Sequence, residues 1–296
     1  MNGRLRLCDN DGRPKMPELP EVETIARGVD ERLRGDRIES TWFSKKPEPF
    51  KSPAQLMATE LQGRKIDRVY RVGKQIVFDL GEGPSKQKHS WLQWIVHLGM
   101  TGRLLVADPA TPVPAHTHGI LLLASGRELR FVDPRRFGRM ALHGVSNKKA
   151  EPARFVGTGS EPLHISRDEF AALFHPRRTS IKAALLNQKL LHGVGNIYAD
   201  ESLFRAGIRP RRMARHLKRA ELDRLRDSLQ VVLKEAISLG GSSVSDYVDA
   251  SGVKGFFQLE HRVYLRTSQP CLVCGTPIRR VVVAGRGTHY CPHCQR

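Results

Sequence analysis

Residues 271–294 read CLVCGTPIRRVVVAGRGTHYCPHC, and they hold four of the five cysteines in a chain of 296 residues. The pairs Cys271/Cys274 and Cys291/Cys294 follow the pattern C-x2-C-x16-C-x2-C, which is typical of a tetrahedral zinc site. Because the protein supplies all four thiolates, we expect a structural zinc ion that holds a short β-hairpin together. A redox-active Cys-x-x-Cys is the alternative, but two copies outside a βαβ unit argue against it. A disulfide framework would instead spread cysteines through a small secreted domain.

Basic residues are concentrated in and before this hairpin. Residues 203–219 contain seven Lys and Arg, residues 261–296 contain six Arg, and neither stretch contains an acidic residue. A solvated helix face normally mixes the two signs, whereas an acid-free basic stretch is typical of phosphate contacts. The whole chain has 49 Lys and Arg against 30 Asp and Glu, a net charge of +19. We therefore expect a polyanionic partner such as duplex DNA.

Upstream of the hairpin, apolar residues recur at helical spacing. The pattern predicts helices at residues 168–173, 179–187, 197–206 and 220–239. Gly207 and the Gly240-Gly241 pair stand where helix C-caps belong.

The first half of the chain has a different periodicity. After a helix predicted at residues 17–35, short β-rich runs are separated by turn residues. The expected strands are residues 65–70, 75–80, 91–98, 102–107, 119–123 and 128–131. So many short strands predict a sheet sandwich or a barrel.

The length suggests about two domains, and residues 144–162 are the candidate linker. We expect an α+β protein with an extension at 1–15, a β-sandwich domain with an N-terminal helix at 16–146, a helical domain at 147–260 and a zinc finger at 261–296. The apolar runs are far shorter than the about 20 residues of a membrane span. No apolar segment follows the charges of residues 1–15, so no signal peptide is expected. These features predict a soluble cytoplasmic protein, associated with the nucleoid through DNA and acting as a monomer.

Four short motifs occur in a fixed order. They are Met16–Glu23 (MPELPEVE), Asp133–Gly138 (DPRRFG), Leu190–Ala199 (LLHGVGNIYA) and Gly285–Cys291 (GRGTHYC). Together they closely resemble the bacterial formamidopyrimidine-DNA glycosylases, over about residues 16–296. Leu19 favours the oxidised-purine branch, because the related endonuclease VIII branch usually opens with Pro-Glu-Gly-Pro. The resemblance implies a helix-two-turn-helix motif in the helical domain.

The resemblance also implies a set of catalytic residues. Pro17, as an N-terminal secondary amine, would attack the sugar C1′ and form a cationic iminium, and Glu18 would support the opening of the sugar ring. Lys74 would supply a proton during β-elimination. Arg286, between two glycines, would bind phosphate and assist δ-elimination. Without the resemblance, Pro-Glu at a helix start is only a favourable helix N-terminus, and Lys74 is an ordinary strand-edge lysine.

Further residues match DNA-contact positions of the family. Met100, Arg135 and Phe137 would fill the gap left by a flipped base. Asn196, after Gly193-Val194-Gly195, would help to bind a phosphate at a helix start. The lesser candidates for phosphate contacts are His97, His116 and Arg177, and the loop near residues 251–257 is expected to cover the flipped base.

The implied function is excision of oxidised purines, such as 8-oxoguanine and formamidopyrimidines, followed by β,δ-elimination at the abasic site. Residues 1–15 conflict with it, because a covalently extended chain cannot offer Pro17 as a free amine. We expect translation to start at Met16. If the extension is retained, the alternative is a non-catalytic protein that binds damaged DNA. A second alternative is an endonuclease VIII-like enzyme for oxidised pyrimidines.

Overall fold

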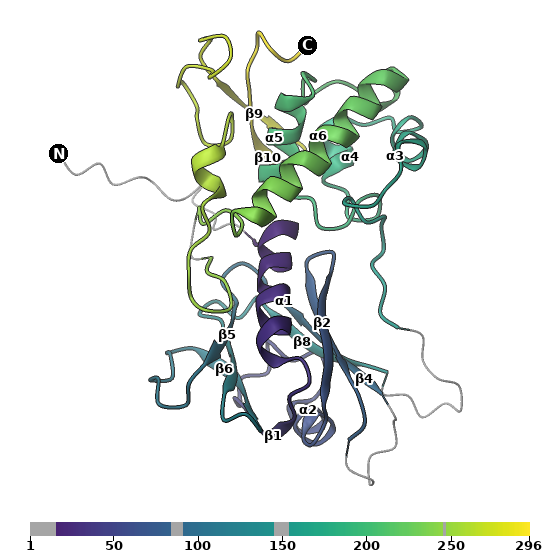
Figure 1. The fold of residues 1–296 in the computed structure, drawn as a ribbon. Coiled ribbons are helices and arrows are strands. Elements are labelled where there is room, and N and C mark those ends of the chain that lie inside the picture. Colours follow the sequence, from purple (N-terminus) through teal and green to yellow (C-terminus); the bar gives the residue numbers. More distant parts are fainter. Residues whose placement is uncertain (1–15, 84–90, 145–153, 245–246) are drawn as a thin grey trace, which may run out of the picture.

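The computed structural model describes residues 16–83, 91–144, 154–244 and 247–296, and the expected extension at 1–15 lies outside them. The described residues form two lobes (Figure 1), a β-rich lobe below and a helical lobe above that carries a small β-hairpin. The long helix α1 (Leu19–Leu33) stands upright between them.

The described residues of the β-rich lobe form two antiparallel four-stranded sheets. The first has the order β1-β6-β7-β5, with strands Ile38–Phe43, Thr117–Leu123, Glu128–Val132 and Arg103–Ala107. The second has the order β2-β3-β4-β8, with strands Ile66–Val72, Gln75–Leu80, Leu92–His97 and Arg139–His143. Inward-facing residues of both sheets share one core, in which Phe78, Trp94 and Phe131 are buried. The helix α2 (Ala54–Leu61) buries Met57 and Leu61 in the same core.

Helix α1 joins the two lobes. Its apolar residues from Val22 to Leu33 recur at helical spacing and are buried in the core of the β-rich lobe. Its first residue, Leu19, belongs instead to the core of the helical lobe, and its N–H donates to the Gly193 carbonyl at 3.0 Å. The start of α1 is therefore held by both lobes.

In the described part of the helical lobe, four helices surround their own core. They are α3 (Arg167–Phe174), α4 (Ile181–Leu185), α5 (Asn196–Arg205) and α6 (Arg219–Ser238), with 3-10 turns at Ala214–His216 and Phe257–Glu260. Ser166 and Ser180 cap α3 and α4 by accepting hydrogen bonds from backbone N–H groups three residues on. Among the described residues, no helix combines the length and the apolar character needed to cross a membrane.

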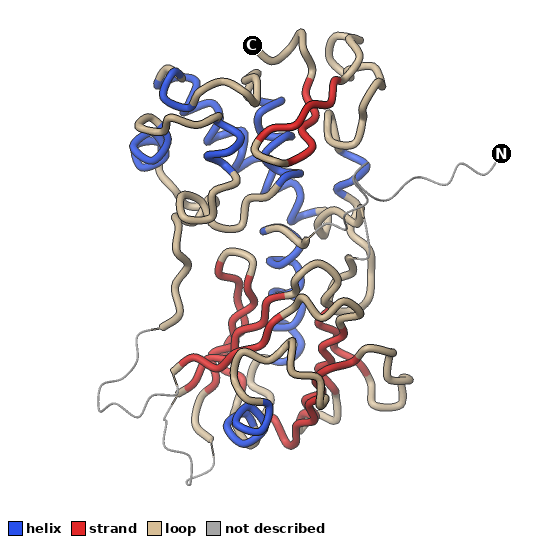
Figure 2. The backbone as a smooth tube through the Cα atoms, turned by 180° about the vertical axis from the view of Figure 1, so that it is seen from behind, coloured by secondary structure: helices blue, strands red, loops and turns tan. Residues whose placement is uncertain are grey.

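The C-terminal hairpin pairs β9 (Arg279–Val283) with β10 (Arg286–Tyr290), and β10 packs against α5. Figure 2 shows this hairpin from behind, in the upper lobe, with the β2–β3 hairpin rising from the lower lobe, and residues of both hairpins line one cavity. Two hairpins from different lobes thus face one side of the lobe junction.

The α+β class predicted from the sequence is confirmed, and each predicted strand corresponds to an observed one. Strands β1 and β8 and helix α2 were not predicted. The helix expected at 179–187 is shorter, because Ser180 caps it and the chain leaves helical pairing after Leu186. The domain boundaries proposed from the sequence stay predictions.

Candidate active site and DNA interface

A cavity of about 600 Å³ opens at the lobe junction, between the β2–β3 hairpin, the start of α5 and the C-terminal hairpin. It brings together six of the residues predicted from the sequence, which are Glu18, Lys74, His97, Met100, Asn196 and Arg286. Pro17 is buried between Met16 and Glu18, which both line the cavity.

Glu18 is buried at the N-terminus of α5. Its Oε1 accepts the Ile197 N–H at 3.1 Å and its Oε2 accepts the Tyr198 N–H at 3.5 Å. A Cβ at Gly195 would lie 2.2 Å from Glu18 Cδ, so only glycine lets the carboxyl group approach this closely. Burial raises the pKa of Glu18 to about 7, with Lys74 opposing the rise. At neutral pH this carboxyl group can therefore both donate and accept a proton.

Glu21 holds the start of α1, and the sequence analysis did not assign it a site role. Its Oε2 accepts the Glu18 N–H at 2.9 Å, and its Oε1 accepts the Ser242 N–H at 2.7 Å and a hydrogen bond from the Tyr198 hydroxyl. Burial raises the pKa of Glu21 as well. The signal for its role was its place three residues after the helix N-cap, where a carboxylate reaches back to the N-cap amide.

Lys74 lies in the turn between β2 and β3, directly after Gly73, whose φ of +63° suits glycine. Burial lowers the pKa of Lys74, while the carboxylates of Glu18 and Glu21 raise it and Arg286 lowers it further. The amine is therefore easier to deprotonate than an exposed lysine, as proton transfer at neutral pH requires.

Arg286 is the first residue of β10, and its exposed side chain borders the cavity. Hydrogen bonds with α4 and α5 fix the hairpin against the helical lobe at this point. Asn196 Nδ2 donates to the Gly287 carbonyl at 2.9 Å, and the buried Lys182 Nζ lies 2.6 Å from Asp200 Oδ1 and donates to Thr288 Oγ1 at 2.8 Å. The position of Arg286 is thus set by α4 and α5.

The three predicted gap-filling residues lie on two loops in direct contact. A Cβ at Gly99 would lie 2.4 Å from the Phe137 carbonyl carbon, which places Met100 next to the loop of Arg135 and Phe137. The Arg135 guanidinium lies 4.8 Å from the centre of the Phe137 ring, and that ring is 45% exposed. An exposed aromatic ring beside a cation is suited to enter a base stack. Met100 lines the cavity, whereas Arg135 and Phe137 lie outside its lining.

The remaining predicted contacts divide into two groups. His97 lines the cavity, and burial, Lys74 and Arg139 lower its pKa. His116 and Arg177 are exposed and lie outside the cavity lining, as does the loop at residues 251–257. The structure therefore does not bring this second group to the reacting centre.

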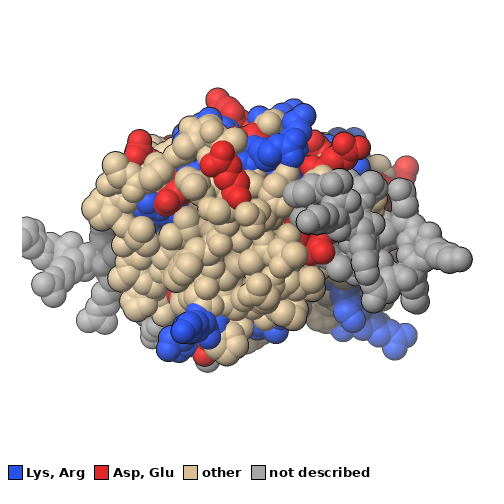
Figure 3. Space-filling view, turned by 90° about the horizontal axis from the view of Figure 1, so that it is seen from below, with Lys and Arg blue, Asp and Glu red and all other residues tan. Residues whose placement is uncertain are grey.

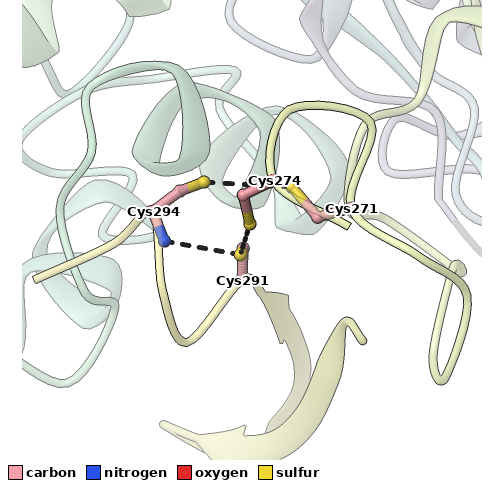
Figure 4. Close-up of side chains that lie close together, drawn as sticks. All are labelled: Cys271, Cys274, Cys291 and Cys294. Atoms are coloured by element: carbon pink, nitrogen blue, oxygen red, sulfur yellow. Dashed lines mark hydrogen bonds between the residues drawn. The ribbon is translucent and has the colours of Figure 1, made fainter. Parts of the chain in front are cut away.

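The four cysteines converge as the zinc prediction requires. Their sulfur atoms all lie within 4.8 Å of one another, and the Cys271–Cys294 and Cys274–Cys291 pairs are separated by 3.9 and 3.5 Å (Figure 4). A zinc ion with Zn–S distances of about 2.3 Å requires sulfur separations of about 3.8 Å. The donor set thus fits a closed structural zinc site.

Charge is distributed unevenly over the surface. The far end of the β-rich lobe, seen from below in Figure 3, has a broad centre without Lys, Arg, Asp or Glu. The acid-free basic stretches at 203–219 and 261–296 lie instead in the helical lobe and the C-terminal hairpin. The two acid-free basic stretches therefore lie away from the uncharged centre of that end.

Three family models match consecutive parts of the chain. The formamidopyrimidine-DNA glycosylase N-terminal domain matches residues 16–140, and the H2TH domain of the same glycosylases matches residues 158–248. A zinc finger found in FPG and IleRS matches residues 268–296.

Curated relatives match along the same length. The formamidopyrimidine-DNA glycosylase of Solibacter usitatus is 46% identical over 281 residues, which cover 95% of this chain and 100% of that protein. The enzyme of the same name from Thiobacillus denitrificans is 43% identical, with the same coverage of both chains.

Solved structures share the fold. A variant of Lactococcus lactis FPG in complex with DNA containing Fapy-dG has a TM-score of 0.81 and 33% identity, covering 95% of this chain and 100% of that one. A complex of the wild-type L. lactis protein with DNA containing an oxidised pyrimidine has a TM-score of 0.80 and 32% identity, with the same coverage. MutM (FPG) from Thermus thermophilus has a TM-score of 0.78 and 40% identity, covering 94% of this chain and 98% of that one.

The family resemblance, the glycosylase class and the structural zinc site expected from the sequence are all confirmed by these matches. The start of α1, the helix-two-turn-helix loop and the four-cysteine hairpin meet around one cavity, and each belongs to a matched domain. This chain belongs to the formamidopyrimidine-DNA glycosylase family.

Proposed function

We propose that this protein excises oxidised purines from duplex DNA and then cleaves the abasic strand by β,δ-elimination. The observation that carries the proposal is the buried carboxyl group of Glu18, which has a pKa of about 7 and lies beside Pro17 in a cavity that also holds Lys74 and Arg286. A proton donor, a lysine amine with a lowered pKa and a guanidinium around Pro17 suit imine chemistry on a sugar better than simple hydrolysis.

In the proposed reaction the Pro17 nitrogen forms a bond to C1′ of the damaged nucleotide as the bond from C1′ to the base breaks. The base leaves with the bonding electrons and takes up the proton that the Pro17 nitrogen loses. Glu18 donates a proton to the ring oxygen as the sugar opens, and the nitrogen lone pair then forms a cationic iminium. Loss of a C2′ proton moves electrons towards this iminium and expels the 3′ phosphate, with Lys74 in the proton transfers. Loss of the C4′ proton then breaks the bond from C5′ to the second phosphate in the δ-elimination, which Arg286 assists.

The nucleotide must leave the base stack before C1′ can be reached. Phe137 is the proposed wedge, Met100 fills the vacated space and Arg135 pairs with the orphaned base. The zinc hairpin and Asn196 bind the backbone phosphates, with His97, His116 and Arg177 as secondary contacts. We further propose that the protein acts as a monomer on DNA in the cytoplasm.

Borohydride trapping tests the proposal. The protein, purified from cells that express the full coding sequence, is mixed with a duplex containing 8-oxoguanine and reduced. Peptide mapping is expected to place one covalent adduct on Pro17. An adduct on another residue would contradict the assigned nucleophile.

The two alternatives are separated by companion measurements. Intact mass spectrometry gives the native N-terminus. A mass that begins at Met1, with lesion binding but no adduct, would support the non-catalytic binder. Parallel cleavage of duplexes with an oxidised purine or an oxidised pyrimidine tests the endonuclease VIII-like alternative, which the L. lactis complex with an oxidised pyrimidine makes worth including.

A further inference from the structure

His192 lines the cavity, but neither the zinc site nor the proposed reaction uses it. It precedes the glycine-rich loop, and its side chain is 12% exposed. Its Nε2 lies 3.1 Å from Glu161 Oε2. Glu161 Oε1 in turn accepts a hydrogen bond from Arg71 Nη2 at 2.8 Å.

Arg71, which donates to Glu161, is itself held in place by further contacts. Its side chain is 4% exposed, its Nε donates to Glu23 on α1 at 2.8 Å, and its Nη1 donates to the Gly73 carbonyl at 3.2 Å. Burial raises the pKa of Glu161, but the contacts with His192 and Arg71 outweigh it and bring that pKa down to about 2. The Glu161 carboxylate therefore stays charged at any working pH and holds both neighbours.

The His192 ring also packs directly on the turn that carries Lys74. A Cβ at Gly73 would lie 3.2 Å from His192 Nδ1, and a Cβ at Gly157 would lie only 2.0 Å from the same atom. The ring is thus enclosed by two glycine backbones from different segments. Both ring nitrogens are buried, and within the described ranges neither makes a regular hydrogen bond, so Nε2 meets Glu161 Oε2 as a close polar contact.

These contacts form a closed path around one turn. It runs from Gly73 through Arg71, Glu161 and His192 back to Gly73. The next residue, Gly193, accepts the N–H of Leu19 at the start of α1. One short segment of the helical lobe therefore contacts both the Lys74 turn and the helix that begins beside Pro17.

We propose that His192 is a positioning residue, which holds the Gly73–Lys74 turn through Glu161 and Arg71 and so places the Lys74 amine for proton transfer at the sugar. The inference rests on the proposed function, because it concerns the elimination step. It predicts that losing the His192–Glu161 contact slows the reaction at saturating protein and leaves the affinity for DNA unchanged.

The experiment uses two substitutions with opposite chemistry. His192→Phe fills the space between the glycines but cannot donate a hydrogen bond, whereas His192→Gln retains an N–H group that can reach Glu161. His175→Ala, at the exposed C-cap of α3, is the matched surface control. Each protein is tested by single-turnover cleavage of pre-formed abasic DNA and by binding to DNA with a tetrahydrofuran site.

We expect His192→Phe to cleave about tenfold more slowly at saturation with a Kd within twofold of the unsubstituted protein, and His192→Gln to recover most of the rate. An unchanged rate for His192→Phe would overturn the inference. So would a raised Kd with an unchanged rate at saturation, because it would make His192 a binding residue.

Hydrogen exchange of the peptide spanning residues 72–76 provides a readout that needs no catalysis. His192→Phe should accelerate its exchange about tenfold, while His192→Gln and His175→Ala leave it unchanged. If the unsubstituted protein fails to cleave abasic DNA, the proposed function fails. The exchange result then decides the His192 inference alone, and equal exchange in all proteins would overturn it.

Discussion

The two lobes contribute different chemistry to the shared cavity. The β-rich lobe and α1 supply the ionisable groups, with Glu18 on the helix and Lys74 in the β2–β3 turn. The helical lobe supplies backbone N–H groups at the start of α5 and a four-cysteine hairpin that presents Arg286. The raised pKa of Glu18 is therefore a property of the junction, because burial between the lobes is the largest cause of the rise.

Removal of the Glu18 carboxyl group is expected to have the largest effect. Glu18→Gln keeps the shape and one acceptor oxygen for the α5 amides but cannot exchange a proton. We expect base excision to fall by about 10²- to 10⁴-fold in single-turnover assays while lesion DNA still binds. A rate within tenfold of the unsubstituted protein would show that Glu18 is not the acid.

The helical lobe is tested separately by removing its metal. Chelation of zinc, or Cys291→Ser, should unfold the hairpin that holds Arg286 and weaken DNA binding by at least about tenfold. The stability of the β-rich lobe should be retained, since its core shares no residue with the core of the hairpin. Binding is measured by fluorescence anisotropy, and unchanged affinity after verified zinc loss would contradict this assignment.

The junction can also be tested through stability. The folded-state pKa of Glu18 is raised from 4.5 to about 7, so the folded protein holds this proton more tightly than the unfolded chain does. The resulting stabilisation of the folded state is present in full below pH 4.5 and is lost as the pH rises through 7. A shift of this size corresponds to about 3 kcal/mol. Urea unfolding should therefore show Glu18→Gln gaining stability relative to the unsubstituted protein between pH 5 and pH 8, and a constant difference would contradict the raised pKa.

The smallest effect on the fold is expected at the wedge. Phe137 is 45% exposed, so Phe137→Ala should change the free energy of unfolding by less than about 0.5 kcal/mol. Base excision from duplex DNA should fall about tenfold, because unstacking loses its apolar partner. Trp42→Ala, at a 51% exposed position on β1 outside the cavity lining, is the control and should leave excision unchanged.

Local patterns in the sequence predicted much of this arrangement. The cysteine spacing specified the zinc hairpin because both ligand pairs lie close together in the chain. Helical spacing predicted α1 and α6 because the buried residues of each helix recur within one short segment of the chain. Strand β1 was missed because most of its residues are partly or fully exposed, so its sequence lacks a clear apolar alternation.

The rest of the site depends on contacts between distant segments. Glu21 acquires its role from Tyr198 and Ser242, which are 177 and 221 residues away. His192 contacts Gly73 only because the two lobes meet. The periodicity of the sequence cannot predict contacts between such distant residues. Before the fold was known, only the family resemblance indicated a role for Lys74.

The most direct test of the junction is the pKa of Glu18 itself. Carbon-13 NMR of protein labelled at the glutamate carboxyl carbons, with the Glu18 signal assigned by its loss in Glu18→Gln, follows the titration. Glu161 serves as an internal reference, with a pKa of about 2. A Glu18 midpoint near 7 is predicted. A midpoint near 4.5 would show that the cavity leaves this carboxyl group as it is in water, and the account of catalysis would be contradicted.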